Sequence, residues 1–278
     1  MSEAATIAAP ADLVGQLRAL KLSGILTTLS NRLLEAEQAQ MSLSELLTML
    51  LSDELEARRN RKLARLIKHA HLDLGQTLEH FDFTFAASAP RALIRDLATC
   101  RFIQRAENVF FLGATGTGKT HLAQALSHAA CRRFFSVEFY KFSALLEAMV
   151  KADLSGSSQR ILKDLSRCDL LVIDEFAMRK LDTRSAEWVY TIIDNRYGSG
   201  STILTSNRSL EDWLAVFPDK VMANAVMDRL AHNAHQIVLK GESYRKKKGL
   251  KDDALNTNKQ AELTTAHPTK RVGNHPTP

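Results

Sequence analysis

Residues 113–120 have the residue types and spacing of a phosphate-binding loop, because they read GATGTGKT. In a loop of the form G-x-x-x-x-G-K-[ST], the glycines let the backbone wrap an anion with its amides pointing inward, and the following helix adds the positive end of its dipole. Lys119 would reach the β- and γ-phosphates, and the Thr120 hydroxyl would bind Mg²⁺. The pattern predicts a site for ATP and Mg²⁺ made of Gly113, Ala114, Thr115, Gly116, Thr117, Gly118, Lys119, Thr120 and His121.

Two adjacent acids, Asp174 and Glu175, follow an apolar run at positions 170–173 that is typical of a buried strand. Carboxylates at the end of a buried strand are costly unless they meet a cation. We therefore expect Asp174 to face the Mg²⁺ on Thr120, through water, and Glu175 to be the base that orients the attacking water. The alternative is that both acids only cap the next helix.

Two further polar residues have positions that suit a nucleotide site. Asn207 follows a predicted strand at 202–206, where its amide can hold the attacking water or the γ-phosphate; the alternative is an ordinary turn asparagine. Arg229 lies in the sequence MDRL, on a predicted helix before the last strand. Its residue type alone favours a surface or salt-bridging arginine.

A dense group of basic residues lies between positions 58 and 68, with no acid among them. One sign of charge at this density suggests a polyanionic partner, although a solvated helix face is the plain alternative. A second basic run at 245–248 either contacts DNA or only aids solubility. The residues that we expect to contact DNA phosphates are Arg58, Arg59, Lys62, Arg65 and Lys68.

The elements that must position these residues follow from hydrophobic periodicity. Helical spacing of leucines predicts helices over 11–40 and 42–69, the second beginning with a capping box of Ser42 and Glu45. From about position 108, short apolar strands alternate with helical segments, which predicts an α/β fold with a parallel sheet. The predicted strands are 108–112, 136–140, 170–174, 202–206 and 236–239.

These elements suggest a division of the chain into four parts. We expect a small all-helical domain at 11–75 and a nucleotide-binding domain at 76–250. The connector at 75–90 contains three phenylalanines, and we expect it to pack on the core that follows. Residues 1–10 are rich in alanine and are expected to be disordered. The polar tail at 251–278 is also expected to be disordered, because it cannot bury enough apolar surface to fold.

The composition of the chain says more about the cellular environment of the protein than about the reaction it performs. The net charge is +6, and its excess lies toward the tail. No apolar run is long enough to span a bilayer, and the first ten residues do not resemble a secretion signal. Three isolated cysteines lack metal or redox spacing, so we expect reduced core thiols in a cytoplasmic protein. GTP is disfavoured, because residues 258–261 read NKQA and place Ala261 where guanine recognition needs an acid.

Taken together, these motifs resemble the AAA+ superfamily, with Walker A at 113–120, Walker B at 170–175 and a sensor asparagine at Asn207. More specifically, residues 11–250 resemble the IstB-like transposition helper ATPases, which are relatives of the DnaC helicase loaders and of DnaA. The segments that carry this resemblance are ARRNRKLARLIKHA, FDF, NVFFLGATGTGKTHLA, DLLVIDEF, ILTSNRSLEDW, MDRL and GESYR.

The resemblance implies a five-stranded parallel AAA+ core without a substantial C-terminal lid, and an arginine finger at Arg229 that acts on a neighbouring subunit. It implies an ATPase that forms a homo-oligomer on double-stranded DNA, without sequence specificity, and presents this DNA to a transposase. A DnaC-like helicase loader is the nearest alternative. A metabolic P-loop kinase is disfavoured by the missing substrate lid, and a nonenzymatic DNA-bridging protein by the intact motifs.

Overall fold

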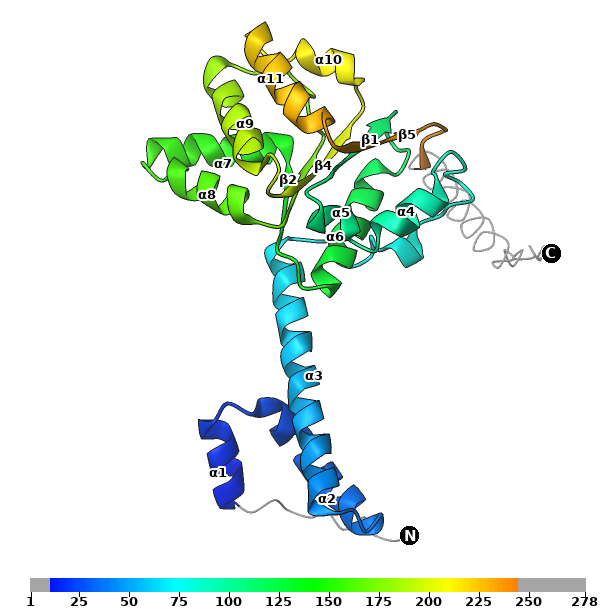
Figure 1. Cartoon of the computed structure of the whole chain (residues 1–278), viewed down its shortest axis with the longest axis vertical. Coiled ribbons are helices and arrows are strands. Elements are labelled where there is room, and N and C mark those ends of the chain that lie inside the picture. Colours follow the sequence, from blue (N-terminus) through cyan, green and yellow to red (C-terminus); the bar gives the residue numbers. More distant parts are fainter. Residues whose placement is uncertain (1–10, 245–278) are drawn as a thin grey trace, which may run out of the picture.

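The computed structural model of the chain describes residues 11–244. Figure 1 shows a long helix, α3 (Leu43–His69), that carries two shorter helices at one end and the sheet with its helices at the other. The segments predicted to be disordered, 1–10 and 251–278, lie outside the described residues, as does the basic run at 245–248. None of the helices within residues 11–244 is both long and apolar enough to cross a membrane.

The N-terminal part contains α1 (Ala11–Ala19), α2 (Ser23–Gln38) and α3. The predicted capping box is confirmed, since the Ser42 side chain accepts from the Glu45 amide and the Glu45 carboxylate accepts from the Ser42 amide. The single helix predicted over 11–40 is wrong in one respect. The chain breaks at Lys21, which has a left-handed φ of 57°, so that α1 and α2 become separate helices.

The contact between α2 and α3 centres on a buried carboxylate, Glu54, which is 3% exposed. One of its oxygens accepts from the amides of Gly24 and Ile25 at the start of α2, and the other accepts from Arg58 and Arg61. Burial by itself raises the pKa of Glu54, but the bond to Arg58 and the two amides outweigh it, and the pKa stays below its usual range. The Glu54 carboxylate therefore caps the N-terminus of α2 and is neutralised by two arginines of α3.

Gly24 allows this close approach of the two helices. A Cβ at position 24 would lie 2.7 Å from the Cβ of Ala57 and 2.8 Å from the Cα of Glu54. We expect Gly24→Ala to destabilise the protein by up to about 2 kcal/mol, because an overpacking cost of about 1–3 kcal/mol is only partly offset by a helix-propensity gain of about 1 kcal/mol. Thermal unfolding followed by circular dichroism measures the effect.

Gly15 in α1 provides the matched control, because a Cβ there would meet nothing within 4 Å. Gly15→Ala is expected to leave stability unchanged or to raise it by up to about 1 kcal/mol. A Gly24→Ala variant as stable as the Gly15→Ala variant would show that α2 and α3 do not pack closely at this point.

The remaining chain forms a five-stranded sheet in the order β2-β3-β4-β1-β5, with all neighbouring strands parallel. This confirms the predicted α/β class, and each predicted strand is present within two residues of its expected ends. The strands are β1 (Asn108–Gly113), β2 (Val137–Lys141), β3 (Leu170–Asp174), β4 (Ser201–Ser206) and β5 (Ala234–Leu239). After β5, residues 240–243 form neither helix nor strand, and Tyr244, the last described residue, is helical.

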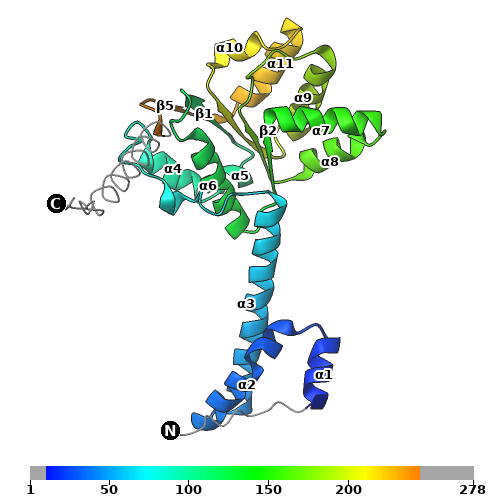
Figure 2. The ribbon, with the colours of Figure 1, turned by 180° about the vertical axis from the view of Figure 1, so that it is seen from behind.

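Helices cover both faces of the sheet, as Figures 1 and 2 show from opposite sides. One face packs through buried side chains such as Leu145, Val189 and Trp213, and the other through Ile94, Leu122 and Leu126. Helices on the first face are α7 (Phe142–Leu154), α8 (Ser158–Arg167), α9 (Thr183–Arg196), α10 (Leu210–Leu214) and α11 (Lys220–Ala231). Those on the second face are α4 (Arg91–Leu97), α5 (Arg101–Gln104) and α6 (Lys119–Arg132), preceded by a short 3₁₀ turn at Leu78–His80.

Strand order and register together define where a site can form. The neighbours β3, β4 and β1 are aligned so that Ile173 lies beside Leu204 and Leu112 lies beside Ser206. The residues that follow these three strands therefore emerge at the same carboxyl edge of the sheet, which is where open parallel sheets bind ligands.

Candidate functional site

The loop between β1 and α6 has the geometry of a phosphate cradle. Gly118 is left-handed with a φ of 96° and directly precedes α6, so the loop ends at the N-terminus of a helix, where free amides and the helix dipole favour an anion. Lys119 is only 9% exposed, and its Nζ donates to the carbonyl oxygens of Gly113 and Ala114, both at 2.8 Å. The Thr117 hydroxyl donates to Ala114 as well. The ammonium group is thus held inside the loop, where phosphate oxygens can replace the two carbonyls as its partners.

Asp174, at the end of β3, faces the loop. It is 2% exposed, and its Oδ1 accepts from the hydroxyls of Thr120, at 2.9 Å, and Thr205. Both of these partners are neutral hydroxyl groups, and a buried carboxylate is further stabilised by a bound cation. Because Thr120 donates its proton to Asp174, its lone pairs are available to a metal ion. A hard cation that prefers oxygen ligands, such as Mg²⁺, fits this arrangement.

Within residues 11–244, no group of three or more His, Cys, Asp or Glu side chains could hold a metal ion. The three cysteines are free and buried, and burial raises the pKa of Cys131 and Cys168 to about 11.

Glu175 and Asn207 lie together with the loop at the carboxyl edge of the sheet. Both are exposed, and both line a small pocket of about 50 Å³ that also includes Lys119 and Thr120. The amide of Glu175 donates to the Thr205 hydroxyl at 3.0 Å, and Glu175 has a left-handed φ of 59°. This turn directs the chain out of the buried strand directly after Asp174. As a result, Asp174 is buried and Glu175 is exposed.

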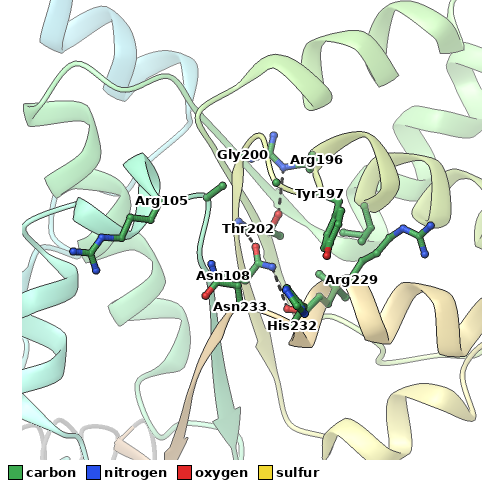
Figure 3. Close-up of a pocket in the computed structure, with 13 residues that line it drawn as sticks. Arg105, Asn108, Arg196, Tyr197, Gly200, Thr202, Arg229, His232 and Asn233 are labelled. Atoms are coloured by element: carbon green, nitrogen blue, oxygen red, sulfur yellow. Dashed lines mark hydrogen bonds between the residues drawn. The ribbon is translucent and has the colours of Figure 1, made fainter.

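Arg229 is the one predicted catalytic residue that the structure does not bring to this edge. It lies near the end of α11, beside the starts of β1 and β5, and lines a pocket of about 220 Å³ at the opposite edge of the sheet. Figure 3 shows its side chain at the rim of this pocket, directed toward α9. There its Nε donates to Asp194 at 2.7 Å, and its guanidinium lies 5.4 Å from the centre of the Tyr190 ring.

A larger pocket, of about 460 Å³, also adjoins the phosphate loop and was not predicted from the sequence. We call it the connector pocket, because most of its wall comes from residues 73–86. Phe81 lies against the loop, since a Cβ on Gly118 would be 2.8 Å from its ring. His121 faces this wall, with its Nε2 2.8 Å from the carbonyl oxygen of Thr77. The prediction that the connector packs on the core is confirmed.

Tyr244 closes the connector pocket from the end of the described chain. Its amide donates to the carbonyl of Gly116 at 3.0 Å, and its ring contacts Phe85 edge to face at 5.1 Å. Both aromatic residues line the pocket. The sequence did show aromatic residues in the connector and in GESYR. Because these segments are far apart in the sequence, it gave no indication that they form one wall of a pocket.

The basic residues on α3 differ in the contacts that they make with the rest of the protein. Arg58 donates to the buried Glu54 at 2.8 Å. The charge of Arg58 is therefore balanced by an acid of the same helix and does not need a partner from outside the protein. Lys62 lies over the ring of Phe134, 4.8 Å from its centre. The remaining predicted DNA contacts, Arg59, Arg65 and Lys68, are exposed, and none forms an ion pair with another described residue.

Comparison with known sequences identifies the relatives of this chain. A family model described as "IstB-like ATP binding protein" matches residues 15–252. A putative ATP-binding protein in an insertion sequence of Mycobacterium tuberculosis is 38% identical over 84% of this chain and 93% of its own length. The putative ATP-binding protein of insertion sequence IS21 from Pseudomonas aeruginosa is 36% identical over 86% of this chain and 90% of its own length.

Solved structures agree on the fold. A DNA replication initiation factor superposes with a TM-score of 0.55 at 21% identity, over 67% of this chain and 56% of its own. DnaA from Aquifex aeolicus, bound to AMPPCP, gives a TM-score of 0.53 at 22% identity, over 67% of this chain and 57% of its own. The core is thus an AAA+ P-loop fold. Together with the family match over 15–252 and the identities above, this shows that the chain belongs to the family of IstB-like ATP-binding proteins.

Proposed function

We propose that this protein hydrolyses ATP at the carboxyl edge of its sheet. The observation that carries the proposal is the shared pocket of about 50 Å³, where Lys119, Thr120, Glu175 and Asn207 converge next to the buried Asp174. The loop amides and Lys119 bind the phosphates, and Thr120, beside Asp174, holds Mg²⁺, which neutralises phosphate charge when bound. Glu175 orients the attacking water and takes its proton, while the Asn207 amide holds that water or the γ-phosphate.

The connector pocket is then the place for the adenosine part of ATP. It adjoins the loop at Gly116, Gly118 and Lys119, and its volume of about 460 Å³ is within the usual range for small-molecule sites. Phe85 and Tyr244 supply aromatic surface on which a purine can stack. In this arrangement the nucleotide bridges the loop, the connector and the chain after β5.

The names of the relatives, which are ATP-binding proteins of insertion sequences, support a role in transposition. In this proposal, ATP drives the protein into a homo-oligomer on double-stranded DNA in the cytoplasm, and the oligomer presents that DNA to a transposase. Arg229 acts on the ATP of a neighbouring subunit, because it lies at the opposite edge of the sheet from its own phosphate loop.

Sedimentation of the full chain tests this function. We expect a larger species when ATP is present together with duplex DNA, and no such shift for Lys119→Ala, because the lysine charge meets the phosphates directly. Normal ATP affinity in Lys119→Ala would refute the site. Assembly on single-stranded DNA in preference to duplex would instead support the helicase-loader alternative.

DNA contact by α3 has its own test, in the salt dependence of duplex binding. Replacing Arg59, Arg65 and Lys68 with alanine should weaken binding about equally on unrelated duplexes, because phosphate contacts carry no sequence information. Each lost contact should also reduce the slope of log affinity against log salt by about 0.9. ATP hydrolysis without DNA should stay unchanged.

Arg58→Ala is the matched comparison for this triple variant. It removes one charge from the same helix, but that charge is already bound to Glu54. We expect it to lower thermal stability and to change the salt slope little. A triple variant that binds duplex with the full slope would exclude this face of α3 as the DNA contact.

A further inference from the structure

Thr205, near the end of β4, is a buried residue whose hydroxyl is bonded to both acids of the ATP site. Its side chain and backbone together are only 1% exposed. The hydroxyl donates its proton to Oδ1 of Asp174 and accepts from the amide of Glu175 at 3.0 Å. Because a hydroxyl has one donor and two acceptor sites, one side chain can make both bonds at once. Thr205 is not among the residues that the sequence predicts for the site.

The bond to Asp174 fixes the direction of a carboxylate that would otherwise rotate. The terminal torsion of an aspartate is broad and two-fold, so the backbone alone does not set it. Two hydroxyls converge on Oδ1, one from Thr120 at 2.9 Å and one from Thr205. Since Thr120 belongs to the phosphate loop and Thr205 to the sheet, the carboxylate is tied to both. Its direction decides how the Asp174 oxygens face Mg²⁺ bound beside Thr120.

The bond to Glu175 holds the backbone at the point where the chain leaves β3. The aligned pairs of β3 and β4 end at Ile173 and Leu204. Beyond this pair Thr205 continues the contact, because its hydroxyl accepts from Glu175 and its carbonyl accepts from the amide of Phe176 at 2.8 Å. The left-handed φ of 59° at Glu175 is unfavourable for a residue with a Cβ and persists only where the surroundings hold it. Thr205 therefore holds the turn from which the Glu175 side chain projects.

We propose, on the basis of the ATP hydrolysis proposed above, that Thr205 is a positioning residue of this site and acts through Asp174 and Glu175. Its hydroxyl orients the first acid toward Mg²⁺ and fixes the backbone of the second, which orients the attacking water. Groups that orient the ligands of a metal ion in this way typically contribute about 10–100-fold to metal affinity or activity. Loss of the hydroxyl should therefore affect the rate and the Mg²⁺ requirement together.

Thr205→Val tests the hydroxyl, because valine has a similar volume and can make neither bond. In steady-state hydrolysis by the full chain, kcat should fall about 10–100-fold, and the Mg²⁺ concentration that gives half of the maximal rate should rise about tenfold. Affinity for ATP without Mg²⁺ should stay unchanged, because the loop amides and Lys119 are untouched. Thr205→Ser keeps the hydroxyl and should restore most of the rate and the normal Mg²⁺ requirement.

Ser201→Ala provides the matched control on the same strand. Ser201 is buried at the start of β4, at the edge of the sheet opposite the ATP site, and its hydroxyl donates to the carbonyl of Phe102 at 3.1 Å. This variant also loses one buried hydroxyl, so it should lower thermal stability while kcat and the Mg²⁺ requirement stay normal. If circular dichroism shows that Thr205→Val does not fold, Thr205→Cys replaces it, because a thiol is only a weak donor and acceptor.

A double-mutant cycle separates the two bonds of the hydroxyl. In a Glu175→Gln background, Thr205→Val should lower the single-turnover rate by a smaller factor than in the unmodified chain, because part of its effect runs through Glu175. The higher Mg²⁺ requirement should remain, because it runs through Asp174.

Two results would overturn the role of Thr205 while the unmodified chain hydrolyses ATP. One is a Thr205→Val chain with normal kcat and a normal Mg²⁺ requirement, and the other is a Thr205→Ser chain as impaired as Thr205→Val. The first would show that the two bonds do not influence the reaction, and the second that the site responds to any change of packing at this position. Absence of ATP hydrolysis by the unmodified chain would instead overturn the proposed function, and the role of Thr205 with it.

Discussion

Glu175→Gln is expected to slow ATP hydrolysis by roughly 10²–10⁴-fold, the usual contribution of a general base, while ATP still binds. Glutamine keeps the size of the side chain but cannot accept the proton of the attacking water. Glu175 is exposed at the mouth of the small pocket that it shares with Lys119 and Asn207, so the substitution leaves no buried group unpaired. Single-turnover hydrolysis and equilibrium binding of ATP separate the two effects.

The variant should also remain assembled on DNA in the presence of ATP, because hydrolysis is the step that would release it. Glu147→Gln, at an exposed glutamate of α7, is the control and should hydrolyse ATP at the normal rate. If Glu175→Gln turns over ATP at close to that rate, another group orients the water, and Glu175 serves only to end β3.

Arg229→Ala should reduce ATP hydrolysis by up to about 10³–10⁵-fold if the arginine acts as a finger on a neighbouring subunit. Binding of ATP to the same subunit should change little, because Arg229 lies at the edge of the sheet opposite its own phosphate loop. The measurement is kcat and KM for ATP under conditions of assembly. The expected pattern is a large fall in kcat with a nearly constant KM.

Mixing experiments distinguish action between subunits from a local role. Arg229→Ala chains supply an intact phosphate loop and Lys119→Ala chains supply an intact arginine, so mixtures should recover activity that neither variant has alone. Absence of recovery at every ratio would mean that Arg229 acts within its own subunit or only through its bond to Asp194.

Arg184 is the matched control for Arg229. It lies on α9, binds Asp153 at 3.0 Å and stacks over Trp188 at 5.4 Å, much as Arg229 binds Asp194 and stacks over Tyr190. Arg184→Ala removes a similar ion pair and a similar aromatic contact. The Arg184→Ala variant should therefore show only the loss of stability that follows from losing these contacts, and it should hydrolyse ATP at the normal rate.

Local sequence patterns were sufficient to predict the five strands and the motifs. An apolar run that ends at Asp174 and a glycine-rich loop before Lys119 depend on neighbours within a few residues, and so does the capping box of Ser42 and Glu45. Such short-range constraints can be read directly from the chain. The parallel sheet follows from the alternation of strands and helices, and its carboxyl edge brings Asn207 to the site.

Contacts between distant residues were decided only by the tertiary structure. The left-handed turn at Lys21 has no glycine or proline to indicate it, and the buried Glu54 gains its amide partners 29 and 30 residues away. The connector pocket likewise joins Phe85 to Tyr244, which no local pattern relates.

Arg229 also shows the difference between what the local sequence predicts and what only the tertiary structure determines. Its motif and the strand after it were evident from the sequence, but its partner Asp194 is 35 residues away on another helix. Periodicity assigns a residue to a face of its own element. Which faces meet depends on how the elements pack against the sheet, and this is a property of the whole fold.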